Sequence, residues 1–248
     1  MKLSKSSKST SFATTESKKT LHKNLGFTAT EQYKLLRANL NFTIPEDVKC
    51  PIIGVTSSMR GEGKSTTAIN LAYVIAESGK RVLLIDGDLR IPSIAKKMNI
   101  ESTPGLTDIL VGPEAGQTGV LKARVLDNWY ILPSGVLPPN PSELLGSRRM
   151  ASTLKVLAEK FDYIIVDLPP VNLVSDALAI SPFLTGMIVV IREDYTEKKE
   201  LENGLRQLQL SNVNILGCVM NESRGDKKYY GKYKYKKYSS YSEESREV

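Results

Sequence analysis

The stretch "PIIGVTSSMRGEGKSTT", residues 51–67, runs from an apolar segment through a glycine-rich loop to a lysine followed by hydroxyl residues. A buried strand, a loop that wraps an anion, and a helix whose first N–H groups face that anion have this order. The stretch therefore predicts a P-loop, in which Lys64 reaches the β- and γ-phosphates and Ser65 ligates Mg²⁺. The predicted nucleotide contacts are Ser58, Arg60, Gly61, Glu62, Gly63, Lys64, Ser65 and Thr66.

This P-loop departs from the strict pattern at one position, because Ser58 stands where G-x-x-x-x-G-K-[ST] has glycine. The alternative interpretation is a chance glycine-rich turn after a strand. The order of strand, loop, GKST and helix favours the phosphate site.

Strand-like and helical segments alternate on both sides of this loop. The apolar runs "KRVLLIDGD", "DYIIVDLPP", "GMIVVIRED" and "VNILGCVMN" alternate with helical patterns such as "SRRMASTLKVLAEKF" and "TEKKELENGLRQLQL". Continuous apolar strands between helices indicate an α/β fold with a doubly wound, mainly parallel sheet. Within residues 91–146 we expect only one short strand, Trp129–Pro133, and a loop made rigid by its prolines.

Three acidic residues follow two of these apolar runs. Asp86 and Asp88 come at the end of "VLLIDGDLR", and Asp167 ends "YIIVDLPP". Ligands of an open parallel sheet bind at the carboxyl ends of its strands, and alternation sends Asp86 and Asp88 to the same side. Acids that merely start loops are the alternative. Three of them beside a GKST loop favour a metal–phosphate site with Ser65, Asp88 and Asp167 as magnesium ligands.

The positive charge of the chain is concentrated at its ends. Residues 1–28 hold six lysines against one glutamate, and residues 222–248 hold eight lysines and arginines against five acids, in a chain of net charge +7. The sequence predicts a disordered basic segment over 1–28, a single domain over 29–221 and a flexible tail over 222–248. The nearly neutral middle speaks against a nucleic-acid-binding face.

The remaining composition points to a reducing compartment. Cys50 and Cys218 lie far apart beside apolar segments, which disfavours a disulfide framework. The N-terminus has no apolar stretch of the secretory type, and the apolar region 178–191 is too short and interrupted to span a membrane. His22 reads as a solvated histidine. We expect a cytoplasmic protein.

The motifs "SSMRGEGKSTT", "VLLIDGDLR" and "IIVDLPP" resemble the Walker A, A′ and B motifs of bacterial tyrosine kinases, whose wider relatives are the deviant Walker ATPases of cell division and plasmid partitioning. The A′ pattern is matched by Asp86, Asp88 and Arg90. The likeness spans about residues 30–241 and is closest to the cytoplasmic partner of the two-chain type found in capsule and exopolysaccharide loci. It implies ATP and Mg²⁺ as cofactors, catalytic roles for Lys64, Asp86 and Asp88, and Asp86 as the base or orienting group for a tyrosine hydroxyl.

The resemblance also implies partners. The helix over 29–42, with "EQYKLLR", is similar to that family's E-x-x-R-x-x-R helix, which implies a homo-oligomer, possibly a ring, with contacts from Glu31, Lys34 and Arg37. Packing of this amphipathic helix on its own sheet is the alternative. A separate membrane-anchored activator or polysaccharide co-polymerase that recruits the chain to the inner face of the membrane, and a cognate tyrosine phosphatase, are further implied. Asp176 either couples the nucleotide state to a neighbouring subunit or simply starts a helix.

The C-terminal stretch "DKKYYGKYKYKKYSSYSEES" matches the family's autophosphorylation cluster. If the last strand is parallel to the others, this tail leaves the sheet at the phosphate edge, and about 25 residues have an r.m.s. reach of roughly 25–30 Å. We expect transfer between subunits. A tail that binds RNA or a membrane surface, a nucleotide-switched positioning ATPase and a non-catalytic scaffold remain alternatives. The predicted acceptors are Tyr229, Tyr230, Tyr233, Tyr235, Tyr238 and Tyr241.

Overall fold

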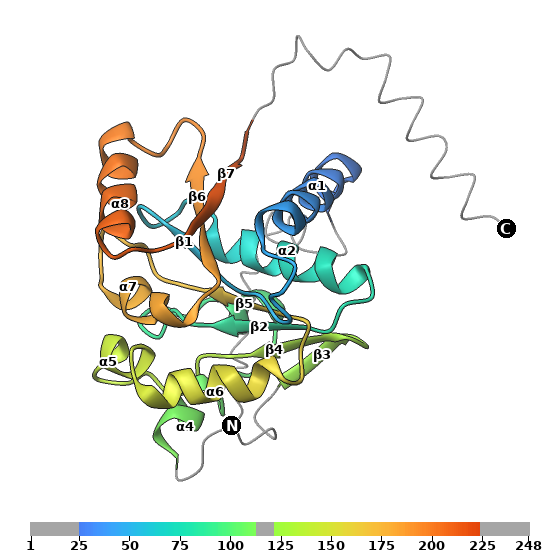
Figure 1. The fold of residues 1–248 in the computed structure, drawn as a ribbon, viewed down its shortest axis with the longest axis vertical. Helices are drawn as coiled ribbons and strands as arrows, with labels where there is room; N and C mark the ends of the chain where they lie inside the picture. The colour runs from blue at the N-terminus through green and yellow to red at the C-terminus, as the bar shows by residue number, and fades with distance from the viewer. Residues whose placement is uncertain (1–24, 113–121, 224–248) are drawn as a thin grey trace, which may run out of the picture.

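A computed structural model of the chain describes residues 25–112 and 122–223 (Figure 1). A seven-stranded sheet in the order β3-β4-β2-β5-β1-β6-β7 runs through the described residues. Every neighbouring pair is parallel except β3 and β4, which pair antiparallel at one edge. The strands are β1 Ile52–Ser57, β2 Val82–Asp86, β3 Lys122–Leu126, β4 Trp129–Leu132, β5 Tyr163–Asp167, β6 Gly186–Arg192 and β7 Ile215–Asn221.

Helices cover both faces of this sheet, as a doubly wound fold requires (Figure 1). They are α1 Phe27–Thr43, α2 Lys64–Glu77, α3 Ile94–Met98, α4 Leu106–Val111, α5 Pro141–Leu145, α6 Arg148–Ala158, α7 Asp176–Ile180 and α8 Lys198–Leu210, with a 3₁₀ turn at Ser181–Phe183.

Alternate residues of the central strands build two separate cores. In β2, Leu83 and Ile85 pack with α4, α6 and α8, whereas Val82 and Leu84 pack with α1, α2 and α3. This alternation follows from the two-residue repeat of a strand. It explains why the predicted strands read as continuous apolar runs, since both faces of the sheet are covered.

The predicted fold is confirmed, and the differences lie in short elements. The short strand expected at Trp129–Pro133 is β4, and the final strand β7 is parallel to β6. Strand β3 and the helices α3, α4 and α5 were not predicted from the segment 91–146. Helix α1 begins at Phe27, two residues before the predicted start of the domain.

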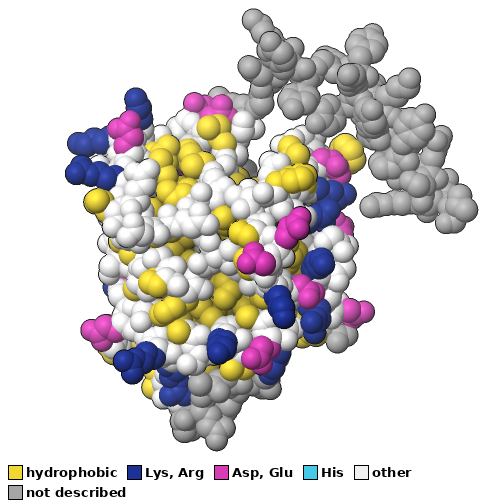
Figure 2. Space-filling view, in the orientation of Figure 1, with side chains coloured by type: hydrophobic (Ala, Val, Ile, Leu, Met, Phe, Trp, Pro, Cys, Tyr) yellow, Lys and Arg dark blue, Asp and Glu magenta, His cyan; other side chains and the backbone are white. Residues whose placement is uncertain are grey.

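Other sequence predictions concern the surface and the ends of the chain. Residues 1–24 and 224–248, with His22 and the predicted tyrosine acceptors, lie outside the described residues. Cys50 and Cys218 are free thiols. No helix among the described residues is long and apolar enough to cross a bilayer. On the face shown in Figure 2, basic and acidic side chains of the described residues are interspersed.

Candidate active site

The predicted P-loop lies between β1 and α2, and its shape depends on two glycines. Gly61 and Gly63 adopt left-handed conformations, with φ of 83° and 96°. Gly63 is also the residue that precedes α2, and a Cβ placed on it would lie 1.9 Å from the side-chain nitrogen of Asn221. Only glycine satisfies both constraints. The loop therefore delivers Lys64 and Ser65 into the first turn of α2, where free N–H groups favour an anion.

Side chains from the far end of the chain hold this loop from outside. Arg192 donates to the Gly61 carbonyl (3.1 Å), Tyr195 to the Arg60 carbonyl (3.1 Å) and Asn221 to the Glu62 carbonyl (3.0 Å). Because three successive carbonyls are engaged, the backbone of the loop is fixed by the protein itself, which preorganises it for phosphate.

The predicted contact residue Glu62 directs its side chain into this support. Its carboxylate is fully buried and accepts hydrogen bonds from the Met59 amide (2.7 Å) and the Thr196 hydroxyl (2.5 Å). The backbone of Glu62 remains part of the loop, but its carboxylate stabilises the loop and does not face the phosphate site. The sequence did not predict a supporting role for Arg192, Thr196 and Asn221, although all of them follow or end predicted strands at the carboxyl edge of the sheet.

The three predicted acids converge on the ammonium group of Lys64. Asp86 and Asp167 end the neighbouring strands β2 and β5 and are paired in register. Lys64 Nζ lies 2.9 Å from Asp88 Oδ2 and 3.5 Å from Asp167 Oδ1. Desolvation alone would lower the pKa of Lys64, but the Asp167 and Asp88 carboxylates outweigh it and raise that pKa. Lys64 is therefore a permanent cation at the centre of the site.

Asp86 has a structural role that the sequence did not predict. It is fully buried, and its Oδ2 accepts from the amides of Ser93 (3.1 Å) and Ile94 (2.9 Å), at the start of α3. Desolvation, and then the charge of Asp167, raise the pKa of Asp86 to about 7. Its other oxygen has no hydrogen-bond partner among the described residues. Asp86 thus anchors α3 with one oxygen, while the other is buried without a hydrogen-bond partner among the described residues.

Ser65, Asp88 and Asp167 form a set of oxygen donors that fits Mg²⁺. Asp167 is fully buried, and neither of its oxygens accepts a well-formed hydrogen bond from the described residues. Desolvation raises the pKa of Asp167, and the neighbouring Lys64 and Ser65 oppose that rise. The described residues contain no group of three His, Cys, Asp or Glu side chains that could enclose a metal ion. Magnesium normally takes one or two carboxylates together with phosphate oxygens and water, so this donor set agrees with it.

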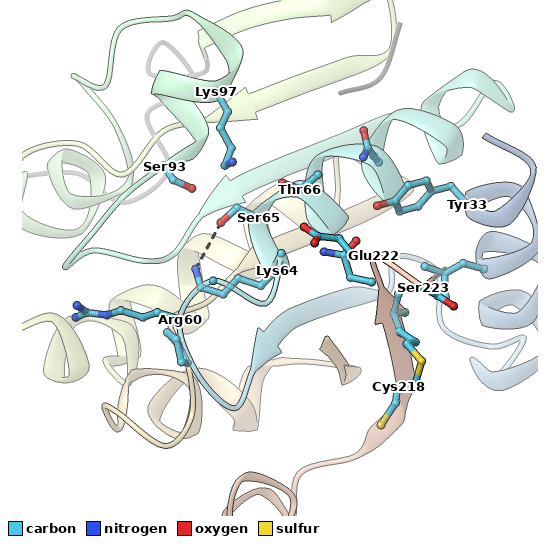
Figure 3. A pocket seen from close by; sticks show the side chains of 18 of the residues that line it. Tyr33, Arg60, Lys64, Ser65, Thr66, Ser93, Lys97, Cys218, Glu222 and Ser223 are labelled. Atoms are coloured by element: carbon cyan, nitrogen blue, oxygen red, sulfur yellow. Dashed lines mark hydrogen bonds between the residues drawn. The ribbon is translucent and has the colours of Figure 1, made fainter. Parts of the chain in front are cut away.

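The remaining predicted nucleotide contacts lie around the same opening. Arg60, Gly61, Gly63 and Thr66 line a cleft of about 1410 Å³ together with Lys64 and Ser65 (Figure 3). Ser58, which replaces the first glycine of the motif, is buried beneath the loop, and its hydroxyl has no partner among the described residues. The site therefore tolerates serine at this position without exposing it.

The described part of the chain ends at this cleft. Strand β7 runs parallel to β6 and ends at Asn221, and the next residues, Glu222 and Ser223, line the cleft with Lys64 (Figure 3). Glu222 also forms a 2.6 Å ion pair with Arg192, one of the side chains that hold the P-loop. The prediction that the chain leaves the sheet at the phosphate edge is confirmed.

Helix α1 packs on its own domain, and the residues predicted to form oligomer contacts differ in their bonding within the chain. Arg37 donates to the Val74 carbonyl of α2 (2.5 Å), so its guanidinium is engaged within the chain. Lys34 and Glu31 form a 3.0 Å pair on the partly exposed side of α1. Both sequence interpretations of α1 remain compatible with this arrangement, but Arg37 has a structural role besides any contact between subunits.

Arg90, the basic residue of the A′ motif, is fixed by Asp176. Its guanidinium makes a two-pronged contact with that carboxylate, at 2.9 and 3.0 Å, and Ser142 Oγ donates to Asp176 at 2.5 Å. Asp176 is fully buried in the first turn of α7. This contact ties the loop after β2 to α5 and α7, so Asp176 is more than a helix-starting acid.

Comparisons with known proteins agree with this site. The family profile described as "AAA domain" matches residues 50–221. The chain is 38% identical over 181 residues to tyrosine-protein kinase YwqD of Bacillus subtilis, covering 71% of this chain and 76% of that protein. It is 35% identical over 175 residues to tyrosine-protein kinase CpsD of Streptococcus pneumoniae, covering 70% and 77%.

Solved structures show the same relationship in three dimensions. The chimerical protein CapA2B2 superposes with a TM-score of 0.76 at 30% identity, over 84% of this chain and 90% of that one. The cell division ATPase MinD of Pyrococcus furiosus superposes with a TM-score of 0.58 at 27% identity, over 71% and 74%. The fold is thus a P-loop fold of the deviant Walker group.

Proposed function

Because this chain belongs to the bacterial tyrosine kinase family, we propose that it transfers the γ-phosphoryl group of ATP to the tyrosine hydroxyls of its own C-terminal cluster. One observation carries this proposal: β7 delivers Glu222 and Ser223 to the cleft that holds Lys64. The six tyrosines of the cluster begin only six residues later, at Tyr229. A flexible tail of about 25 residues has an r.m.s. reach of roughly 25–30 Å, so its tyrosines could enter the site of a neighbouring subunit without refolding of the domain.

The residues of the site divide the chemistry among them. The phenol oxygen forms a bond to the γ-phosphorus, the bond from that phosphorus to the β–γ bridging oxygen breaks, and ADP leaves. Lys64 and the amides of the P-loop neutralise charge on the transferred group. Asp86 accepts the phenolic proton or orients the hydroxyl through the oxygen not engaged by α3. A general base is most effective with a pKa near the working pH, which agrees with the raised pKa of Asp86, about 7.

We assign Mg²⁺ to Ser65, Asp88 and Asp167. These three residues would hold the ion, which would supply positive charge to offset that of the phosphate oxygens. Asp88 also pairs with Lys64, at 2.9 Å. Nucleotide and metal binding therefore involve a rearrangement of this pair, so that Lys64 can turn toward phosphate.

A positioning ATPase is the second candidate, because the fold and the P-loop are shared with the cell division ATPase. Incubation of the full chain with γ-labelled ATP and Mg²⁺, followed by digestion, separates the two. Label on Tyr229–Tyr241 that is lost in Lys64→Met supports the kinase. Free phosphate without labelled tyrosine supports the ATPase, and no turnover at all supports a scaffold modified by other enzymes.

Family membership also supports a regulated membrane context. We propose that the chain acts in capsular or extracellular polysaccharide synthesis, in the cytoplasm, and that a separate membrane-anchored protein recruits and activates it at the inner face of the membrane. A cognate tyrosine phosphatase would reverse the modification. Fusing the cytoplasmic tail of a candidate activator to this chain should raise its labelling rate. An unchanged rate with every candidate activator would contradict the activation model.

We further propose a homo-oligomer, possibly a ring, that uses Glu31, Lys34 and Arg37 of α1. Lys34→Glu is the cleaner test, because its pair with Glu31 is partly exposed and contributes little to stability. Arg37→Glu also removes the contact with Val74 and would destabilise the subunit itself. Sedimentation should show smaller assemblies for folded Lys34→Glu. Assemblies of unchanged size would contradict this contact.

A further inference from the structure

Helix α3 is held in a fixed position beside the phosphate site. The Ser93 and Ile94 amides at its start donate to Asp86 Oδ2, at 3.1 and 2.9 Å. Ile94 and Ala95 are buried in the protein interior. A short helix has little stability of its own, so these contacts determine where its later residues lie. Whatever α3 presents to the cleft is therefore positioned by Asp86, a residue of the A′ motif.

α3 presents Lys97 to the cleft. Lys97 lines the same cleft as Lys64, Ser65 and Asp88. Figure 3 shows its side chain extending from α3 in the direction of the first turn of α2. The neighbouring Lys96 is exposed on the same helix, as Lys97 is, but it does not line the cleft.

The charge of Lys97 is not neutralised by a nearby carboxylate. Lys64 has carboxylate oxygens at 2.9 and 3.5 Å, whereas Lys97 forms no ion pair with the part of the chain that the structure describes. Desolvation lowers the pKa of Lys97. The negative charge of Asp167 opposes this shift, and the positive charge of Lys64 adds to it. Lys97 is exposed at the surface of the cleft, and its ammonium group lies within the electrostatic reach of Asp167 and Lys64.

We propose that Lys97 is a second phosphate-binding cation of this site, contacting the terminal phosphoryl group of bound ATP from α3. The proposal rests on the nucleotide site described above. The P-loop lysine marks the β/γ end of the triphosphate, and the side chain of Lys97 extends toward that end, where the charges of Lys64 and Asp167 act on it. A cation that already pairs with carboxylates contributes less free energy to the binding of an anion than a cation without such a partner. Lys97 would also oppose the charge that develops on the transferred group.

Nucleotide affinity tests this assignment without depending on turnover. Calorimetry on the full chain with Mg²⁺ would compare ADP with a non-hydrolysable ATP analogue. For Lys97→Met we expect the analogue to bind about tenfold more weakly, because one charge-assisted contact is lost, and ADP to bind within about twofold of wild type. Lys97→Arg should keep most of the analogue affinity, because the charge remains.

Lys96→Met is the matched control and should change neither affinity. Unaltered analogue binding by Lys97→Met, or an equal loss for ADP and analogue, would overturn the assignment. Thermal unfolding of both variants checks that the fold is intact, and Lys97→Gln replaces Lys97→Met if the latter is unstable. If the protein transfers no label to tyrosine but Lys97→Met still loses affinity for the ATP analogue and not for ADP, only the kinase proposal is refuted. Labelled tyrosine without the selective loss would refute only the role of Lys97.

Discussion

The buried carboxyl group of Asp86 makes the stability of the nucleotide-free protein depend on pH in a defined way. Burial, and then the charge of Asp167, raise the pKa of Asp86 from 3.8 to about 7. Between these values the folded state keeps a proton that the unfolded state has released. The free energy of unfolding therefore falls as the pH rises through this window, and the loss is complete once the pH passes about 7.

Asp86→Asn should remove this dependence. One pKa unit corresponds to about 1.36 kcal/mol, and between pH 5.5 and pH 8 Asp86 crosses about 1.5 units of its window. The variant should therefore gain about 2 kcal/mol relative to wild type over that pH range, or about 4–8 °C in Tm. The amide oxygen of asparagine can still accept from the Ser93 and Ile94 amides, so α3 should keep its anchor.

Urea unfolding at a series of pH values, without nucleotide or divalent cations, measures the effect. Asp47→Asn, an exposed acid in the loop before β1, is the matched control, and its curve should run parallel to wild type. Parallel curves for Asp86→Asn and wild type would refute the electrostatic reasoning. The gain in stability should be accompanied by a loss of tyrosine labelling from γ-labelled ATP, because replacing an unfavourably buried catalytic group commonly stabilises a protein at the expense of its activity.

Three further predictions concern the support of the site and the route of transfer. Asn221→Ala should raise the KM for ATP several-fold and cost about 1 kcal/mol of stability, because the carbonyl of Glu62 loses its donor. Nucleotide titration measures the KM and urea unfolding measures the stability. An unchanged KM would contradict the role of this contact. Asp176→Asn should cost about 1–3 kcal/mol in urea unfolding, because the guanidinium of Arg90 loses its charged partner, whereas a neutral result would show that the contact is incidental. Mixing Lys64→Met chains with active chains that lack the tail should label the Lys64→Met tail, and no label there would exclude transfer between subunits.

The sequence predicted the parts of the site that are local in the chain. The P-loop, the acids at the ends of β2 and β5, and the apolar strands are short motifs whose residue types are demanded by backbone geometry and burial. Lys64, Asp88 and Asp167 meet because parallel strands bring their carboxyl ends to one edge. Neighbouring apolar runs were therefore enough to predict that these side chains converge.

What the sequence did not predict depends on distant contacts. Arg192 lies 131 positions from Gly61 and Asn221 lies 159 from Glu62, so no local pattern marks them as supports of the P-loop. Helix α3 has five residues and is held by Asp86, so its sequence alone carries no helical signal. The antiparallel strand β3 was missed for a similar reason, because its register with β4 is irregular and its segment is rich in charge.

A single-turnover experiment that follows the γ-phosphoryl group tests the central claim most directly. The full chain, in excess over γ-labelled ATP with Mg²⁺ and quenched at intervals, yields the share of label on tyrosine and the share released as free phosphate. We expect most of the label to appear on Tyr229–Tyr241 before free phosphate accumulates, and Lys64→Met to abolish this phase. Release of free phosphate at the full rate, with the tail unlabelled, would contradict the central claim.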